Sequence, residues 1–261
     1  WLLRNRAILY IWNRELDKAL DLYKKIILEL GSQVYIWSEV SQCVTDNLEV
    51  KIGLFALGLQ IQGDQEQHNN LRISLVELLL SAGLLENALI ELDIYKNEGG
   101  NSWKYDALYK KLDKVNSSIT NNSELYKKTI PQAQNIIYSD FEWTDLVLVE
   151  KWNSKANDNF LIFSDGKEIN FVVKEKDLIS YSKYSVGKVY ATKLHKIVDK
   201  VEDSKEGAIN RYFKKKPVNR YVPVMIKDAG VEDWIILPED YGYIHSINYD
   251  SKTIHIVSGK S

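Results

Sequence analysis

Several features that commonly reveal an enzyme or a secreted protein are missing from this sequence. Cys43 is the only cysteine among 261 residues, which excludes an internal disulfide and a cysteine-based zinc cluster. The sequence has no glycine-rich phosphate loop, no nucleophile-elbow serine motif and no His-Glu metalloprotease pattern. We therefore expect a protein with no enzymatic activity, no cofactor and no bound metal. The lone cysteine also favours a reducing compartment, and we expect a cytoplasmic protein.

Strong charge of one sign and long apolar runs are missing as well. Lys and Arg number 34 and Asp and Glu number 36, so the formal net charge is −2 and no global field attracts nucleic acid or membrane. No run reaches the roughly 20 apolar residues of a membrane helix, so we expect no membrane partner. Hydrophobic residues make up 45% of the chain, enough to bury a core in one large domain or two ordinary ones.

What the chain does contain is a helical pattern that recurs at intervals of 34 and 35 residues. The corresponding positions are Ala7, Ser41 and Val76 in one set and Ala19, Gly53 and Ala88 in the other. The residue of the second set has a small side chain or none in all three copies, which lets two antiparallel helices approach closely. The pattern is clearest over 13–25 and 78–95, and it resembles the tetratricopeptide repeat. That resemblance implies an α-solenoid whose concave face takes a peptide or a partner protein.

The repeat register identifies the residues that would line such a groove. In the first helix of each pair, the solvent-facing candidates are Arg6, Tyr10, Glu39 and Gln42. The chain also begins at Trp1 inside a helical pattern. We therefore expect it to be a fragment of a larger protein, with further repeats upstream. An accessory part of a larger enzyme, with its catalytic region upstream, stays open as an alternative.

The composition changes near residue 116. Before it the chain favours helix and contains no proline, and 116–123 is a linker rich in Asn and Ser. We predict an α+β multidomain protein, in which an α-solenoid precedes an antiparallel β-barrel. The predicted divisions are a helical repeat domain over 1–115, a linker with a helix over 116–140, and a β-rich domain over 141–261, which is either one barrel or two small subdomains, 141–197 and 218–261.

The β-rich part shows an alternation with a period of two. This period predicts strands over 145–152, 160–164, 169–173, 187–194, 221–226, 233–238, 241–248 and 253–258. Asp-Gly within 164–167 predicts a hairpin turn. The layout resembles an OB-fold or cold-shock barrel. Trp143 and Trp152 are expected in the barrel core or at its ends, and Trp12, Trp37 and Trp103 between helical hairpins.

One basic and aromatic cluster suggests contact with single-stranded nucleic acid. Its members are Arg211, Tyr212, Phe213, Lys214, Lys215, Lys216, Arg220 and Tyr221. Cationic side chains would contact phosphates, and the aromatic rings would stack on exposed bases. The alternative is a solvated loop that its aromatic residues anchor to the barrel.

A row of Tyr241, Tyr243, His245 and His255 alternates along two neighbouring strands and could stack bases or bind a metal. Cross-strand packing is the simpler interpretation. Taken together, the sequence predicts a non-enzymatic scaffold that binds a protein or peptide, with a β part that can contact nucleic acid. A module specialised for single-stranded nucleic acid is the alternative.

Overall fold

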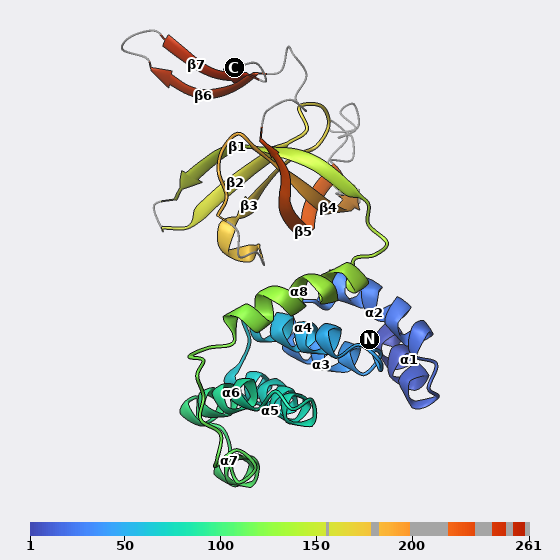
Figure 1. Cartoon of the computed structure of the whole chain (residues 1–261). Helices are drawn as coiled ribbons and strands as arrows, with labels where there is room; N and C mark the ends of the chain where they lie inside the picture. Colours follow the sequence, from blue (N-terminus) through green and yellow to red (C-terminus); the bar gives the residue numbers. More distant parts are fainter. Residues whose placement is uncertain (155–156, 179–182, 199–218, 233–241, 249–252, 259–261) are drawn as a thin grey trace, which may run out of the picture. The chain divides into compact units, whose positions relative to one another are not determined.

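The computed structural model describes residues 1–154, 157–178, 183–198, 219–232, 242–248 and 253–258 (Figure 1). The chain divides into two compact units, Trp1–Ser139 and Asp140–Ser261. The first unit is helical, and the second is built mainly of antiparallel strands. The predicted α+β class, with helices first and strands second, is therefore confirmed.

Residues 1–139 contain eight α-helices. They are α1 (Leu2–Trp12), α2 (Leu16–Leu30), α3 (Val34–Ser41), α4 (Leu48–Leu59), α5 (Gln65–Ser81), α6 (Leu85–Asn97), α7 (Ser102–Tyr109) and α8 (Ser123–Ile137). Side-chain oxygens cap some N-termini, because the first amides of a helix lack partners inside it. Asn47 accepts from the Val50 amide at 3.0 Å, and Asp64 accepts from the Gln67 amide at 2.8 Å.

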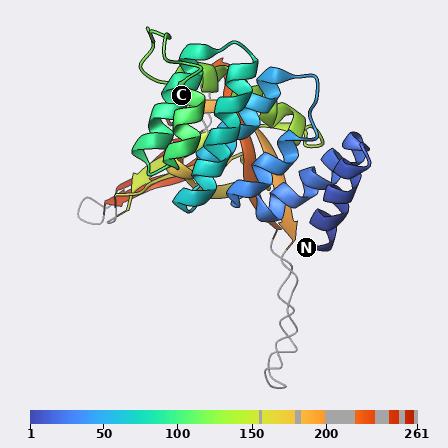
Figure 2. The ribbon, with the colours of Figure 1, turned by 90° about the horizontal axis from the view of Figure 1, so that it is seen from below.

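The first six helices form three consecutive pairs. Within each pair, α1 packs on α2, α3 on α4, and α5 on α6. Neighbouring pairs meet where α2 contacts α3 and where α5 contacts both α3 and α4. An ion pair between Arg4 and Glu39 joins α1 to α3. Figures 1 and 2 both show α1, in dark blue, at one end of the helical unit.

A continuous apolar core holds α3 to α7 together. Leu75, Val76 and Leu79 of α5 have no exposed surface, and neither does Leu92 of α6. Burying a side chain of this size stabilises a fold by about 1.5–3 kcal/mol relative to leaving it in water. The periodic apolar residues of the sequence therefore form the core that joins the pairs.

Helix α8 lies outside the predicted repeat, yet it packs directly on α4. A Cβ placed on Gly53 would lie 2.2 Å from the Thr129 carbonyl oxygen and 2.9 Å from Cβ of Ala133. The nearest atoms to position 53 thus belong to α8, not to the other helix of its pair. Ala19 and Ala88, at the corresponding positions, are fully buried too. The small residue at position 53 therefore makes room for a helix that the repeat pattern did not include.

The β unit contains a five-stranded antiparallel sheet with the strand order β3-β2-β1-β4-β5. Its strands are β1 (Trp143–Asn153), β2 (Asn159–Ser164), β3 (Asn170–Lys174), β4 (Lys188–Val198) and β5 (Asn219–Glu232). The two edge strands, β3 and β5, also contact each other, so the sheet curls into a half-barrel (Figure 1). These strands confirm the predicted ones between 145 and 226.

Burial separates the two faces of this sheet. Leu146, Leu148 and Tyr190 belong to the inner apolar cluster. Val147 and Val149, which alternate with Leu146 and Leu148 along β1, belong to a second cluster on the outer face. The central strand β1 is therefore buried on both faces over this stretch, and the inner cluster forms the core of the half-barrel.

The predicted Asp-Gly turn between β2 and β3 is confirmed. The Asp165 carboxylate accepts from the backbone amides of Lys167 and Ile169 at 2.8 and 2.9 Å. Gly166 has a φ of +72°, which a residue with a side chain rarely adopts. Local hydrogen bonding and glycine together fix this hairpin.

The second predicted β segment contains a separate two-stranded sheet, β6 (Gly242–Asn248) with β7 (Thr253–Ser258). The backbone register places Tyr243 opposite Val257 and His255 opposite Ser246. A register shift between Ile244 and Ser246 falls at His245, so the expected alternation is interrupted there. The strand predicted over 233–238 lies outside the described residues, as does Tyr241.

Candidate functional site

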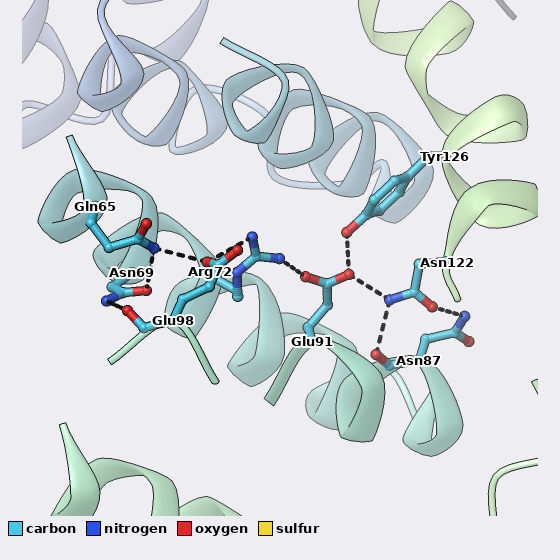
Figure 3. Close-up of polar contacts among 8 residues, drawn as sticks. All are labelled: Gln65, Asn69, Arg72, Asn87, Glu91, Glu98, Asn122 and Tyr126. Carbon is cyan, nitrogen blue, oxygen red and sulfur yellow. Dashed lines mark hydrogen bonds and ion pairs between the residues drawn. The ribbon is translucent and has the colours of Figure 1, made fainter. Parts of the chain in front are cut away.

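The most extensive polar cluster in the helical unit surrounds Glu91 of α6 (Figure 3). Glu91 has 1% of its surface exposed and forms an ion pair with Arg72 of α5. Its other carboxylate oxygen accepts from the Tyr126 hydroxyl at 2.6 Å and from the Asn122 amide at 2.7 Å. Both oxygens of this buried carboxylate are therefore bound by donors from α5 and from the start of α8.

Further residues extend this cluster in both directions. At one end, the amide of Asn87 donates to Asn122 at 2.7 Å, and Asn122 donates to the Asn87 carbonyl at 3.0 Å. At the other end, Arg72 donates to Glu98 at 3.2 Å. Burial, followed by the negative charge of Glu91, raises the pKa of Tyr126 well above its ordinary value. Tyr126 therefore stays a hydroxyl donor, and the cluster is a support that joins α5 and α6 to the start of α8.

The four predicted groove residues lie in different settings. Arg6 donates to the Tyr10 hydroxyl at 2.9 Å, and this pair is exposed. Gln42, just after α3, is exposed. Glu39 instead accepts from Arg4 and, at 2.9 Å, from the Tyr23 hydroxyl. Arg6, Tyr10 and Gln42 are thus available at the surface, while Glu39 serves an internal contact between helices.

The same region contains the single cysteine. Cys43 is buried, and burial, with a smaller contribution from Glu39, raises the pKa of its thiol to about 12. A thiol with such a pKa remains protonated at neutral pH and is a poor nucleophile. This agrees with a structural role for Cys43 in the second helix pair.

Helix α1 exposes large apolar side chains. The exposed fractions are 87% for Leu2, 53% for Leu9 and 74% for Trp12. Positions 2, 9 and 12 share one helical face, since they are separated by seven and three residues. The expectation that Trp12 and Trp103 lie between helical hairpins is wrong, because Trp103 is also 65% exposed. Trp37, at 3%, is buried as expected.

The β unit presents a stacked aromatic pair on its outer face. The rings of Trp152 and Phe160 lie 4.4 Å apart with an angle of 9° between their planes. Leu161, the next residue after Phe160, belongs to the inner cluster, so Phe160 faces outward. The ammonium of Lys174 lies 5.6 Å from the Phe160 ring. Trp152 is 40% exposed, so of the two expected places, the barrel core and the barrel ends, the core is excluded.

Ion pairs surround this aromatic pair. Asp158 binds Lys174 at 3.1 Å and Lys176 at 2.7 Å, and Lys151 binds Glu175 at 2.8 Å. Hydrogen bonds from Lys176 and then Lys174 lower the pKa of Asp158. The charges near the rings are therefore nearly balanced, which leaves the aromatic surface as the main feature of this site.

The predicted nucleic-acid cluster is described only in part. Arg211, Tyr212, Phe213, Lys214, Lys215 and Lys216 lie outside the described residues. Arg220 is exposed at the start of β5. Tyr221 packs against the inner cluster, with the ammonium of Lys196 at 5.9 Å from its ring. Of the two described members, Arg220 is the one at the surface.

The described part of the chain offers neither a metal site nor a membrane-spanning helix. No group of three or more His, Cys, Asp or Glu side chains among the described residues could hold a metal ion. No helix in that part is long and apolar enough to cross a membrane. Two of the histidines make other contacts: His68 bonds to the Ile61 carbonyl at 2.8 Å, and His195 meets the Phe141 ring edge-on.

Comparison with known proteins identifies a family for the helical unit. Residues 1–133 match the model of a family described as a domain of unknown function, DUF7017, and the chain belongs to this family. The match includes α1 to α7 and ends within α8. No curated protein and no solved structure matches the chain.

Proposed function

We propose that this chain is a non-enzymatic binding protein whose β unit binds single-stranded nucleic acid. The observation that carries the proposal is the stacked, outward-facing pair of Trp152 and Phe160 on β1 and β2. Exposed aromatic rings provide stacking surfaces for unpaired bases, whatever their sequence. Val172 of β3 lies opposite Ile162 of β2 and is 56% exposed, so it extends this apolar surface.

The strand order supports the same proposal. In the OB-fold, a five-stranded barrel, the face around the second and third strands binds oligonucleotides and oligosaccharides. Here β1 lies between β2 and β4, and β3 contacts β5, as in that fold. The Trp152–Phe160 pair lies next to the corresponding face.

Replacing Trp152 with alanine tests this function. We expect the full chain to bind a labelled oligothymidylate more tightly than a duplex, and more weakly as salt rises. Trp152→Ala should weaken binding by about 1–3 kcal/mol, the usual contribution of one stacked base. Fluorescence anisotropy measures both effects. Trp103→Ala, which removes an exposed tryptophan from α7, is the matched control. No binding by the wild type, or equal losses in both variants, would reject the proposal.

A second function is favoured by a separate observation, the exposed apolar face of α1. We infer that the helical unit, with its tandem helix pairs resembling tetratricopeptide repeats, is a scaffold that docks a helical segment of a partner protein. Each pair already packs against the next through its helices, so a further helix could pack on α1 in the same way. Arg6 lies in α1, Arg14 follows this helix, and α1 contains no acidic residue, so the expected segment is amphipathic and acidic.

Leu9→Asp tests the scaffold function. Adding a carboxylate to the apolar face should lower the amount of captured partner protein at least tenfold, because it introduces an unpaired charge into the contact. Quantitative mass spectrometry of proteins retained by the immobilised full chain measures this loss. Trp103→Asp is the control for a new charge at an exposed apolar position. The bound segments, mapped on peptide arrays, should be acidic and amphipathic. An unchanged set of captured proteins would contradict the scaffold function.

A further inference from the structure

A second aromatic site with positive charge lies at the beginning of β1. The ammonium groups of Lys193 on β4 and Lys227 on β5 lie 5.1 and 4.3 Å from the centre of the Trp143 ring. Trp143, which the sequence predicts in the barrel core or at its ends, is 37% exposed and therefore lies outside the core. Lys193 is only 5% exposed. Two cations from different strands are thus held at one accessible indole ring.

This site faces outward and is distinct from the Trp152–Phe160 pair. Trp143 alternates with Leu146 and shares its face with Val147 of the outer cluster. Trp143 and Trp152 are nine residues apart on the same strand. At roughly 3.3 Å per residue, they are separated by about 30 Å. The two aromatic surfaces could contact different nucleotides of one strand.

Charged groups of both signs lie near Lys193. Burial lowers the pKa of Lys193, and the charge of Lys227 lowers it further, while Asp140 acts in the opposite direction. The net shift is downward, so the charged form of Lys193 is less favoured here than in water. Asp145, opposite Ala191 in the register, is another carboxylate on this face. An anion placed beside both ammonium groups would relieve their repulsion.

We propose that Trp143, Lys193 and Lys227 form a second binding site, which takes a phosphate group of a single-stranded nucleic acid and stacks the adjoining base on the indole. Lysine ammonium groups provide the contact to the phosphate, and the exposed ring provides the stacking surface. Because it requires a nucleic-acid ligand, this inference rests on the proposed function. The site lies on β4 and β5, the two strands that the predicted basic segment connects.

The experiment uses the full chain and a labelled oligothymidylate, with affinity measured by anisotropy over a series of salt concentrations. Lys227 is exposed, so Lys227→Gln should fold normally and should reduce the slope of log affinity against log salt by about 0.7. Trp143→Ala should weaken binding by roughly tenfold or more. Lys110→Gln, just after α7, is the charge control and should change neither quantity. Circular dichroism verifies the fold of each variant.

The outcomes separate this inference from the proposed function. Suppose that the wild type binds and Trp152→Ala weakens binding, but Lys227→Gln and Trp143→Ala leave the slope and the affinity unchanged. The second site is then rejected and the proposed function stands. If the wild type does not bind the oligonucleotide at all, the proposed function fails and the inference fails with it. If polyglutamate binds in a Lys227-dependent way and the oligonucleotide does not, the site takes acidic peptide, and the nucleic-acid assignment is overturned.

Discussion

Glu91→Ala is expected to destabilise the helical unit by about 3–5 kcal/mol, because it leaves the Arg72 guanidinium buried without its main partner. The side chain of Arg72 is 11% exposed, and that of Glu91 is 2% exposed. The same change removes the acceptor of the Tyr126 hydroxyl and one acceptor of Asn122. Urea unfolding followed by the helical circular dichroism signal measures the loss of free energy.

Glu98→Ala is the matched control, since Glu98 also pairs with Arg72 but at the surface end of the cluster. Its side chain is 36% exposed, so we expect a cost below about 1 kcal/mol. The double variant Arg72→Leu with Glu91→Leu should recover part of the stability, because both buried charges are then removed together. Equal losses for Glu91→Ala and Glu98→Ala would contradict the role assigned to the cluster.

The importance of Glu91 could not be predicted from the sequence. Within its helix it resembles any acidic residue on a solvent-facing position. Its partners Asn122 and Tyr126 are 31 and 35 residues away. Asn122 lies within the predicted linker, and Tyr126 follows it. Only the packing of α8 brings these residues together, and that packing is a property of the tertiary structure.

Local patterns, in contrast, were good predictors of local structure. The 3.6-residue period predicted the helices of the first part, and the two-residue period predicted β1 to β5. Asp165 and Gly166 predicted the hairpin turn, because its hydrogen bonds involve only neighbouring residues. The strand order depends on contacts distant in sequence, such as that between β3 and β5. The predicted strands alone could not establish it.

The exposed positions of the strand tryptophans were also not predicted from the sequence. Tryptophan in a strand is usually explained by core packing. Trp143 nevertheless lies on the outer face, because it alternates with Leu146 of the inner cluster. Trp152 reaches the same face because the register shifts between Leu148 and Glu150, which pairs Trp152 with the outward-facing Phe160. Counting positions along β1 could have predicted the outward orientation of Trp143, since Trp143 is three positions from Leu146 and residues at odd spacing lie on opposite faces of a strand. The lysines beside Trp143 come from β4 and β5, and no sequence spacing indicated them.

Gly53→Val is expected to destabilise the helical unit by about 3 kcal/mol, at the upper end of the usual cost of overpacking. The first added carbon would lie 2.2 Å from the Thr129 carbonyl oxygen and 2.7 Å from the carbonyl carbon. Both are backbone atoms of α8, so a side-chain rotation cannot relieve the clash and α8 must move. Urea unfolding measures the loss, and hydrogen exchange should show faster opening of the α8 amides.

A pair of alanine variants provides the control for this prediction. Alanine stabilises a helix by about 1 kcal/mol relative to glycine, so Gly53→Ala without a clash would make the protein more stable. Gly58 lies in the same helix, but the atom nearest to its added carbon is the terminal methyl of Leu71, at 2.6 Å. That side chain can rotate, although Cβ of Trp37 at 2.9 Å also limits the space. Gly53→Ala should therefore cost more than Gly58→Ala. A stabilising Gly53→Ala would show that α8 does not pack tightly against α4, and the attachment of α8 to the helix pairs would have to be abandoned.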